Sequence, residues 1–106
     1  MTKIKDKEAF TRYVLNSKGL HVVRFCTEWS GPCHMMNPVY ERMQVLFSDH
    51  CTFYKIDIDE SPSLKMEFNI TELPTILIYR NGIMVDQFVG LLPGDSFIEK
   101  LEKFVQ

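Results

Sequence analysis

The sequence lacks any long run of apolar residues and any long run of basic residues. Residues 1–10 alternate lysines with acids and hold no apolar segment as long as a signal peptide or a membrane span, which favours a cytoplasmic location. The formal net charge is −2, so electrostatics give no case for nucleic acid or an anionic membrane surface as a partner. No repeat, low-complexity tract or linker divides the 106 residues, and we expect a single domain over 1–106.

Cysteine is scarce, and the three cysteines lack the spacing of a disulfide framework. Cys26, Cys33 and Cys51 are an odd number, which favours reduced thiols in a reducing compartment. For Cys26 we predict a packed thiol on a strand, with a disulfide to Cys33 as the alternative. The histidines show no metal-ligand spacing with the cysteines, so we expect neither a metal nor another cofactor.

The apolar residues that are present follow alternating strand-like and helix-like patterns. Asp6 predicts a helix cap, and Asn81-Gly82 between two apolar runs predicts a β-hairpin. Together the patterns predict strands at 2–4, 20–27, 51–58, 76–80 and 83–89, and helices at 6–15, 31–47, 63–68 and 95–105. This order indicates an α/β domain whose sheet begins with parallel crossovers and closes with an antiparallel hairpin.

One motif carries recognisable chemistry but lacks one of the atoms that the chemistry needs. A dithiol exchange site has two cysteines two residues apart, so that the second resolves the mixed disulfide made by the first. Residues 29–33 read Trp-Ser-Gly-Pro-Cys at the start of a predicted helix, with Ser30 at the first sulfur position and Cys33 at the second. A hydroxyl is not ionised near neutral pH, so dithiol exchange through this motif is expected to be disabled.

This motif, together with Glu72-Leu73-Pro74-Thr75, Asn81-Gly82 and Val89-Gly90, resembles the thioredoxin family over essentially the whole chain. The resemblance implies the thioredoxin fold, with a central mixed sheet of about five strands flanked by four helices. It also implies that Pro74 is cis and that the backbone of Leu73 pairs with an extended substrate segment, as a sheet edge does. A shallow apolar surface follows, called the docking surface below, and its residues are Trp29, Gly31, Pro32, Leu73, Pro74, Val89 and Gly90.

The first departure from the family pattern is Ser30. In the family an attacking cysteine stands there, and the cysteine at the position of Cys33 resolves the mixed disulfide. Ser30 can instead cap the following helix, a role worth about 1 kcal/mol. For Cys33 we predict an inert buried thiol, with a reactive monothiol as the alternative.

The second departure is Arg24. Thioredoxins usually place a buried aspartate at this position as a proton acceptor, partnered by a lysine that Lys55 matches. A guanidinium stays protonated and cannot serve as that base. We expect Arg24 to reach solvent or to pair with an acid such as Glu28 or Asp57, because a buried unpaired cation is costly. The alternative is that Arg24 lowers the pKa of Cys33 and activates it.

The other side chains of the motif helix are predicted to be structural. We expect His34 to be exposed rather than to assist Cys33, because successive helical residues point in different directions. Met35, Met36 and Met43 are predicted to fill the core, with an adaptable binding surface as the alternative.

Three functions follow from these observations. The first is a protein thiol-disulfide oxidoreductase of cell redox homeostasis whose attacking cysteine is missing, with protein disulfides as substrates and thioredoxin reductase as the partner if the chain is redox-active. The second is a redox-inactive adaptor module that binds an extended protein segment. The third, a monothiol enzyme, would use Cys33 with glutathione.

Overall fold

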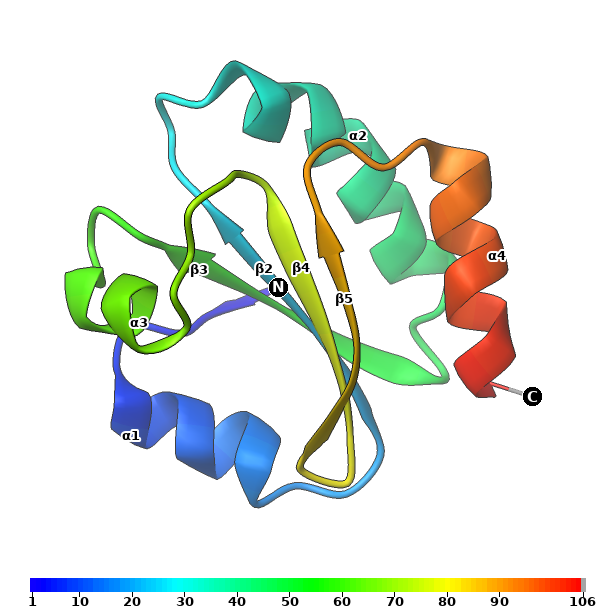
Figure 1. Ribbon diagram of the computed structural model, residues 1–106. Helices are drawn as coiled ribbons and strands as arrows, with labels where there is room; N and C mark the ends of the chain where they lie inside the picture. The colour runs from blue at the N-terminus through cyan, green and yellow to red at the C-terminus, as the bar shows by residue number, and fades with distance from the viewer. Residues whose placement is uncertain (106) are drawn as a thin grey trace.

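The computed structural model describes residues 1–105, in which five strands form one mixed sheet with the order β1-β3-β2-β4-β5 (Figure 1). The first three strands in that order are parallel, and β4 and β5 run antiparallel as the closing hairpin. The α/β prediction is therefore confirmed. The strands are β1 (Thr2–Lys3), β2 (Leu20–Cys26), β3 (Cys51–Asp57), β4 (Thr75–Arg80) and β5 (Ile83–Val89).

The helices lie in two pairs on opposite faces of this sheet. They are α1 (Lys7–Phe10), α2 (Gly31–Leu46), α3 (Pro62–Glu67) and α4 (Gly94–Val105). Figure 1 shows α1 and α3 on one side and α2 and α4 on the other. Within residues 1–105, no helix is long and apolar enough to cross a membrane.

The first helix differs from the prediction in its second half. Asp6 caps it as expected, because its Oδ1 accepts a hydrogen bond of 2.7 Å from the Ala9 amide. After Phe10 the chain continues as a π-helix over Thr11–Leu15, in which the Asn16 amide donates to the Thr11 carbonyl five residues back. Apolar periodicity alone does not distinguish these two helix types at this length.

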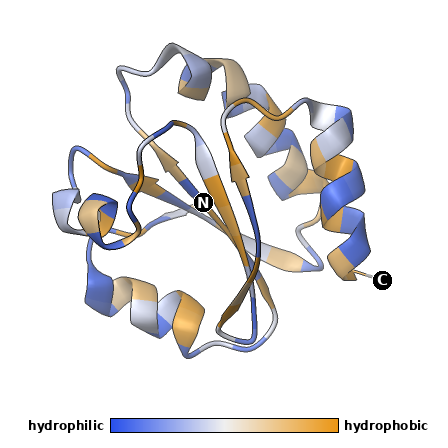
Figure 2. Cartoon of the chain, viewed as in Figure 1, coloured by the Kyte–Doolittle hydropathy of each residue, from blue (hydrophilic) through white to orange (hydrophobic). Residues whose placement is uncertain are grey.

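The sheet is buried on both faces by apolar side chains. One core cluster packs β2 and β3 against α2 and α4, and the other packs the opposite face against α1 and α3. Every residue of β2 is buried, as predicted for a central strand. Figure 2 shows hydrophobic colour along the middle strands, and both colours alternating around α4. His21 and Arg24 are the two polar exceptions in β2, and Arg24 lies on the α2 face between Val22 and Cys26.

Candidate functional site

Three chain segments meet at one edge of the sheet. Phe25 near the end of β2 pairs with Thr75 at the start of β4, and Thr75 pairs in turn with Val89 at the end of β5. Residues 27–30, which follow β2, therefore leave the sheet at the same edge as Leu73-Pro74 and Val89-Gly90. The fold brings the segments of the predicted docking surface to this edge.

Ser30 is the N-cap of α2. Its backbone is extended, with φ −87° and ψ 119°, and its Oγ accepts a hydrogen bond of 3.2 Å from the Cys33 amide. Pro32 lies in the first turn, where a missing backbone N–H costs nothing. The Ser30 hydroxyl, at the position of the first sulfur, therefore caps α2, as the sequence predicts.

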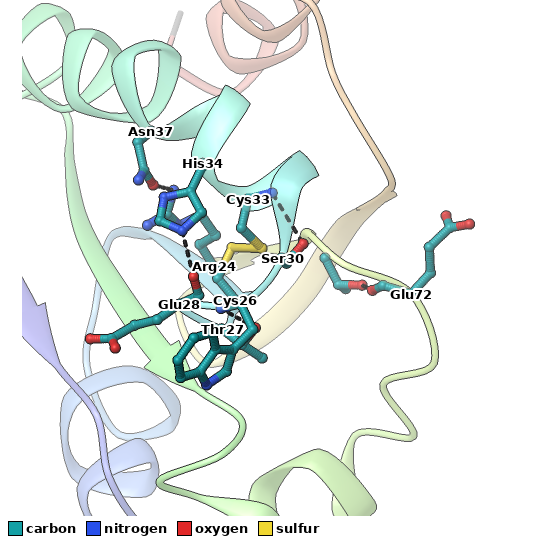
Figure 3. Close-up of a disulfide and its surroundings, with 11 residues drawn as sticks. Arg24, Cys26, Thr27, Glu28, Ser30, Cys33, His34, Asn37 and Glu72 are labelled. Carbon is teal, nitrogen blue, oxygen red and sulfur yellow. Dashed lines mark hydrogen bonds between the residues drawn. A yellow bond between two sulfur atoms is a disulfide. The ribbon is translucent and has the colours of Figure 1, made fainter.

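Cys33 forms a disulfide with Cys26, and this overturns our prediction of two packed thiols (Figure 3). The Cα atoms of the two residues lie 5.8 Å apart, well within the span of a disulfide. Cys26 is the last residue of β2 and Cys33 lies in the first turn of α2, so the bond closes the loop that carries Trp29. Both the inert-thiol and the monothiol interpretations of Cys33 require a free thiol that this state does not have. Cys51 is the one free cysteine within residues 1–105 and is buried.

Arg24 is largely buried and, within residues 1–105, pairs with no acid, so the expectation of a solvent-exposed or acid-paired side chain is wrong. Its side chain is 9% exposed, and its Nη1 donates a hydrogen bond of 2.7 Å to Asn37 Oδ1. The guanidinium carbon also lies 4.6 Å from the centre of the Tyr40 ring, at the distance of a cation–π contact. Burial lowers the pKa of Arg24, and Tyr40 and Glu41 partly oppose that effect. A neutral amide and an aromatic face therefore hold this cation in place of a carboxylate.

Lys55 lies directly beside Arg24 in the sheet, since the two residues are register partners between β2 and β3. Lys3 on β1 pairs in register with Lys55, so one line across three strands carries three cations. Lys3 binds Glu60 at 3.0 Å. Among residues 1–105, neither Arg24 nor Lys55 forms an ion pair.

The residues predicted to form the docking surface differ in their exposure. The Leu73–Pro74 peptide bond is cis, as predicted, and the Gly90 amide donates a hydrogen bond of 2.8 Å to the Pro74 carbonyl. Trp29 and Val89 are exposed, at 86% and 52%, while Leu73 is half-buried and Pro74 is buried. Gly31 and Pro32 are exposed at the start of α2. Apolar side chains are therefore accessible from both the α2 side and the hairpin side of this edge.

The remaining predictions for α2 hold only in part. His34 is exposed and its Nε2 contacts the Glu28 carbonyl, so it does not face Cys33. Met36 and Met43 are buried in the core, but Met35 is 68% exposed and the core prediction for it is wrong. In the part of the chain that the structure describes, no group of three or more His, Cys, Asp or Glu side chains is arranged to hold a metal ion.

The comparison with known proteins places this geometry in a family. The chain matches the family model described as thioredoxin over residues 1–103. The chain belongs to the thioredoxin family. It is 34% identical to thioredoxin 2 of Chlorobaculum tepidum, covering 91% of this chain and 88% of that protein. It is 33% identical to the thioredoxin of Chlamydia trachomatis, covering 97% of this chain and 98% of that protein.

Solved thioredoxins share the fold closely. The structure of Plasmodium falciparum thioredoxin superposes with a TM-score of 0.87 at 29% identity, over 98% of this chain and 99% of that one. The thioredoxin of Malassezia sympodialis gives a TM-score of 0.88 at 27% identity, over 100% of this chain and 91% of its own. The predicted thioredoxin fold, with five strands and helices on both faces, is therefore confirmed.

Sequence reasoning missed the Asn37 partner of Arg24 and gave the Cys26–Cys33 disulfide only as the alternative. Arg24 and Cys26 are two apart on a strand, and Cys33 and Asn37 are four apart on a helix, so each pair shares one face. Facing elements with these spacings align Cys26 with Cys33 and Arg24 with Asn37, as Figure 3 shows. These spacings are the one signal in the sequence that relates the two contacts, although they do not by themselves choose the partners.

Proposed function

We propose that this thioredoxin-family chain binds an extended polypeptide segment at its docking surface, and that its Trp-Ser-Gly-Pro-Cys motif does not exchange disulfides with that segment. The observation that carries the proposal is the Ser30 hydroxyl at the position of the attacking sulfur, where it accepts the Cys33 amide. A serine hydroxyl without an adjacent general base is a poor nucleophile near neutral pH. Cys33, joined to Cys26, leaves the motif with no free thiol.

The surface around Ser30 supports the binding half of the proposal. The cis Pro74, the hydrogen bond from Gly90 to its carbonyl, and the exposed Trp29 and Val89 remain around the altered position. An extended segment that pairs with the backbone of Leu73 gains main-chain hydrogen bonds, and the apolar side chains supply contact area. A protein disulfide substrate and an adaptor's partner segment can both present such an extended stretch of chain.

Insulin reduction driven by dithiothreitol tests the claim that the motif does not exchange disulfides. We expect the unaltered chain to give no more reduction than dithiothreitol alone. The double variant Cys26→Ser/Ser30→Cys restores two cysteines at the motif and cannot form the disulfide with Cys26, so it should accelerate reduction. Cys33→Ser added to that background should abolish the gain. For the Cys26→Ser/Ser30→Cys variant, thioredoxin reductase with NADPH is the expected recycling partner.

The other outcomes assign the other functions. An inactive Cys26→Ser/Ser30→Cys variant that is folded by circular dichroism removes the oxidoreductase interpretation and leaves the redox-inactive adaptor. Turnover by the unaltered chain contradicts the proposal. If that turnover disappears in Cys33→Ser but survives in Cys26→Ser, monothiol chemistry through Cys33 is the explanation.

Paired surface variants test the binding half. Val89→Asp places a charge on the docking surface, while Val45→Asp places one on an exposed part of α2, since Val45 is 76% exposed. In the restored Cys26→Ser/Ser30→Cys background we expect Val89→Asp to raise the KM for insulin and Val45→Asp to leave it unchanged. Equal KM values in the two variants would remove the docking surface from the proposal. The cytoplasmic location stays a prediction.

A further inference from the structure

A pocket of about 140 Å³ opens beside the Cys26–Cys33 disulfide, where the carboxyl ends of β2 and β3 meet the start of α2. Both cysteines line it, and none of the seven docking-surface residues does. The space is large enough to hold a small molecule beside the disulfide. The disulfide is therefore approached from a site that is separate from the docking surface.

The inner wall of this pocket carries cations without acidic partners. Arg24 and Lys55 both line it, and neither has a carboxylate within ion-pair distance among residues 1–105. The Arg24 side chain is nine-tenths buried, and its Nε has no hydrogen-bond partner, although Nη1 is held by Asn37. A buried cation without a carboxylate partner is unfavourable, and an anion that enters the pocket beside Arg24 and Lys55 would offset that cost.

Acidic residues also line the pocket, and they limit how much negative charge a ligand can carry. Glu28 is exposed, and Asp57 Oδ1 already accepts a hydrogen bond of 2.8 Å from the Asp59 amide. Lys3, the third cation, is neutralised by Glu60. Arg24 and Lys55 are thus the pocket's two cations without an ion-pair partner among residues 1–105, while Glu28 and Asp57 offset their charge over the pocket as a whole, so the ligand should carry no more than a single carboxylate.

We propose that the pocket binds a low-molecular-weight thiol bearing a carboxylate, and that this thiol reduces the Cys26–Cys33 disulfide. The carboxylate lies against Arg24 and Lys55, and the sulfur reaches the disulfide that lines the same pocket. This activity goes beyond the proposed function and uses neither Ser30 nor the docking surface.

The reaction proceeds by two exchange steps. The small thiolate attacks Cys26 Sγ, a mixed disulfide forms, and the Cys26–Cys33 bond breaks with its electron pair on Cys33 Sγ. A second small thiolate attacks the small-molecule sulfur of the mixed disulfide and leaves Cys26 as the thiolate. Two small thiols are oxidised to one small disulfide, the cysteine pair gains two electrons, and the two thiol protons end on Cys26 and Cys33.

Two observations favour attack at Cys26. Cys26 is 8% exposed and Cys33 is 3% exposed, so Cys26 is the less buried residue of the pair. Cys33 lies in the first turn of α2, where the helix dipole and unpaired amide groups stabilise a thiolate. A better-stabilised thiolate leaves faster, so the bond breaks toward Cys33.

Three thiols of similar length but different charge test the proposal: mercaptopropionate, mercaptoethanol and cysteamine. The rate of disulfide reduction in the full chain is followed by alkylation and mass spectrometry. Lys55→Gln removes one cation from the pocket, and Lys103→Gln removes an exposed one on α4 as the matched control. Each rate is divided by the unaltered chain's rate with the same thiol, which cancels the intrinsic reactivity of that thiol.

We expect Lys55→Gln to lower the rate with mercaptopropionate by about fivefold, to leave mercaptoethanol unchanged and to leave cysteamine unchanged or faster. Arg24→Gln should act in the same direction, and propionate, which has no sulfur, should slow mercaptopropionate in the unaltered chain. Lys103→Gln should change none of the rates. Equal ratios for all three thiols, no inhibition by propionate, or a folded chain whose cysteines are all free would overturn the proposal. The assay contains no polypeptide, so failure here is distinguishable from failure of the docking surface.

Discussion

Arg24 donates a hydrogen bond of 2.7 Å to Asn37 Oδ1. Arg24 precedes Cys26 by two residues on β2, and Asn37 follows Cys33 by one turn on α2, so this contact lies next to the Cys26–Cys33 disulfide. The two contacts join the same strand to the same helix. One is covalent and the other holds a buried cation, so the start of α2 is fixed to the sheet at two adjacent levels.

Asn37→Ala is expected to destabilise the fold by about 2 kcal/mol, because it leaves the buried guanidinium without its side-chain acceptor. Arg24→Met keeps an unbranched side chain and removes the charge, so it should be close to neutral. In the Arg24→Met background, Asn37→Ala should then cost much less. Urea unfolding of the four proteins gives the comparison, and an equal cost of Asn37→Ala in both backgrounds would show that the hydrogen bond is not the cause.

Ser30→Ala should lower the free energy of unfolding by about 1 kcal/mol, since the Cys33 amide loses its capping oxygen. Ser30→Asp should retain the cap. Ser63→Ala, at an exposed serine in α3, is the control and should change stability by less than about 0.5 kcal/mol. Urea denaturation under oxidising conditions measures all three, and a loss in Ser30→Asp as large as in Ser30→Ala would contradict the capping role.

Alkaline pH should destabilise the protein through its buried tyrosines. Burial raises the pKa of Tyr40, whose hydroxyl donates a hydrogen bond of 2.7 Å to the Tyr54 carbonyl, and burial also raises the pKa values of Tyr54 and Tyr79. The folded state therefore holds these protons more tightly than the unfolded state. Stability is complete below the ordinary tyrosine pKa of about 10 and falls as pH rises above it, by up to about 1.4 kcal/mol per pH unit for each group.

Tyr40→Phe isolates this effect. The variant loses a hydrogen bond at every pH, but its stability should fall less steeply above pH 10 than that of the unaltered chain. Urea unfolding across the alkaline range gives the two slopes, and parallel slopes would rule out Tyr40 as a source of the pH dependence.

The hairpin turn gives a test of backbone fit. Gly82 has φ +83°, and a Cβ there would collide with the Leu15 carbonyl oxygen, whereas Gly19 has φ +92° with no atom within 4 Å of its Cβ position. Both Gly→Ala changes incur the cost of a left-handed backbone, about 1 kcal/mol. Gly82→Ala should cost clearly more, and equal midpoints for the two variants in thermal unfolding would contradict the collision.

The fold was predictable because local signals agree with it. Asn81-Gly82 predicts the hairpin, and the structure has positive φ at both residues, 51° and 83°, as a type I′ turn requires. The apolar runs gave the strands to within one or two residues. The π-helix over Thr11–Leu15 was not predictable, because its apolar spacing fits an α-helix equally well.

Features of the site were predictable only where a single local segment of the chain determines them. The Ser30 cap depends on its own turn, and the cis Pro74 on a resemblance in the neighbouring residues. The partners of Arg24 and Cys26 come from another element, and the choice between thiol and disulfide or between acid and amide depends on distances that one sequence does not contain.

The disulfide closes the loop that carries Trp29, so the proposed docking surface and the cysteine pair share one loop. Binding and reduction are then thermodynamically linked. A polypeptide that binds the oxidised form more tightly by some factor must oppose reduction of the disulfide by the same factor, and the state of the disulfide reports whether the docking surface is filled.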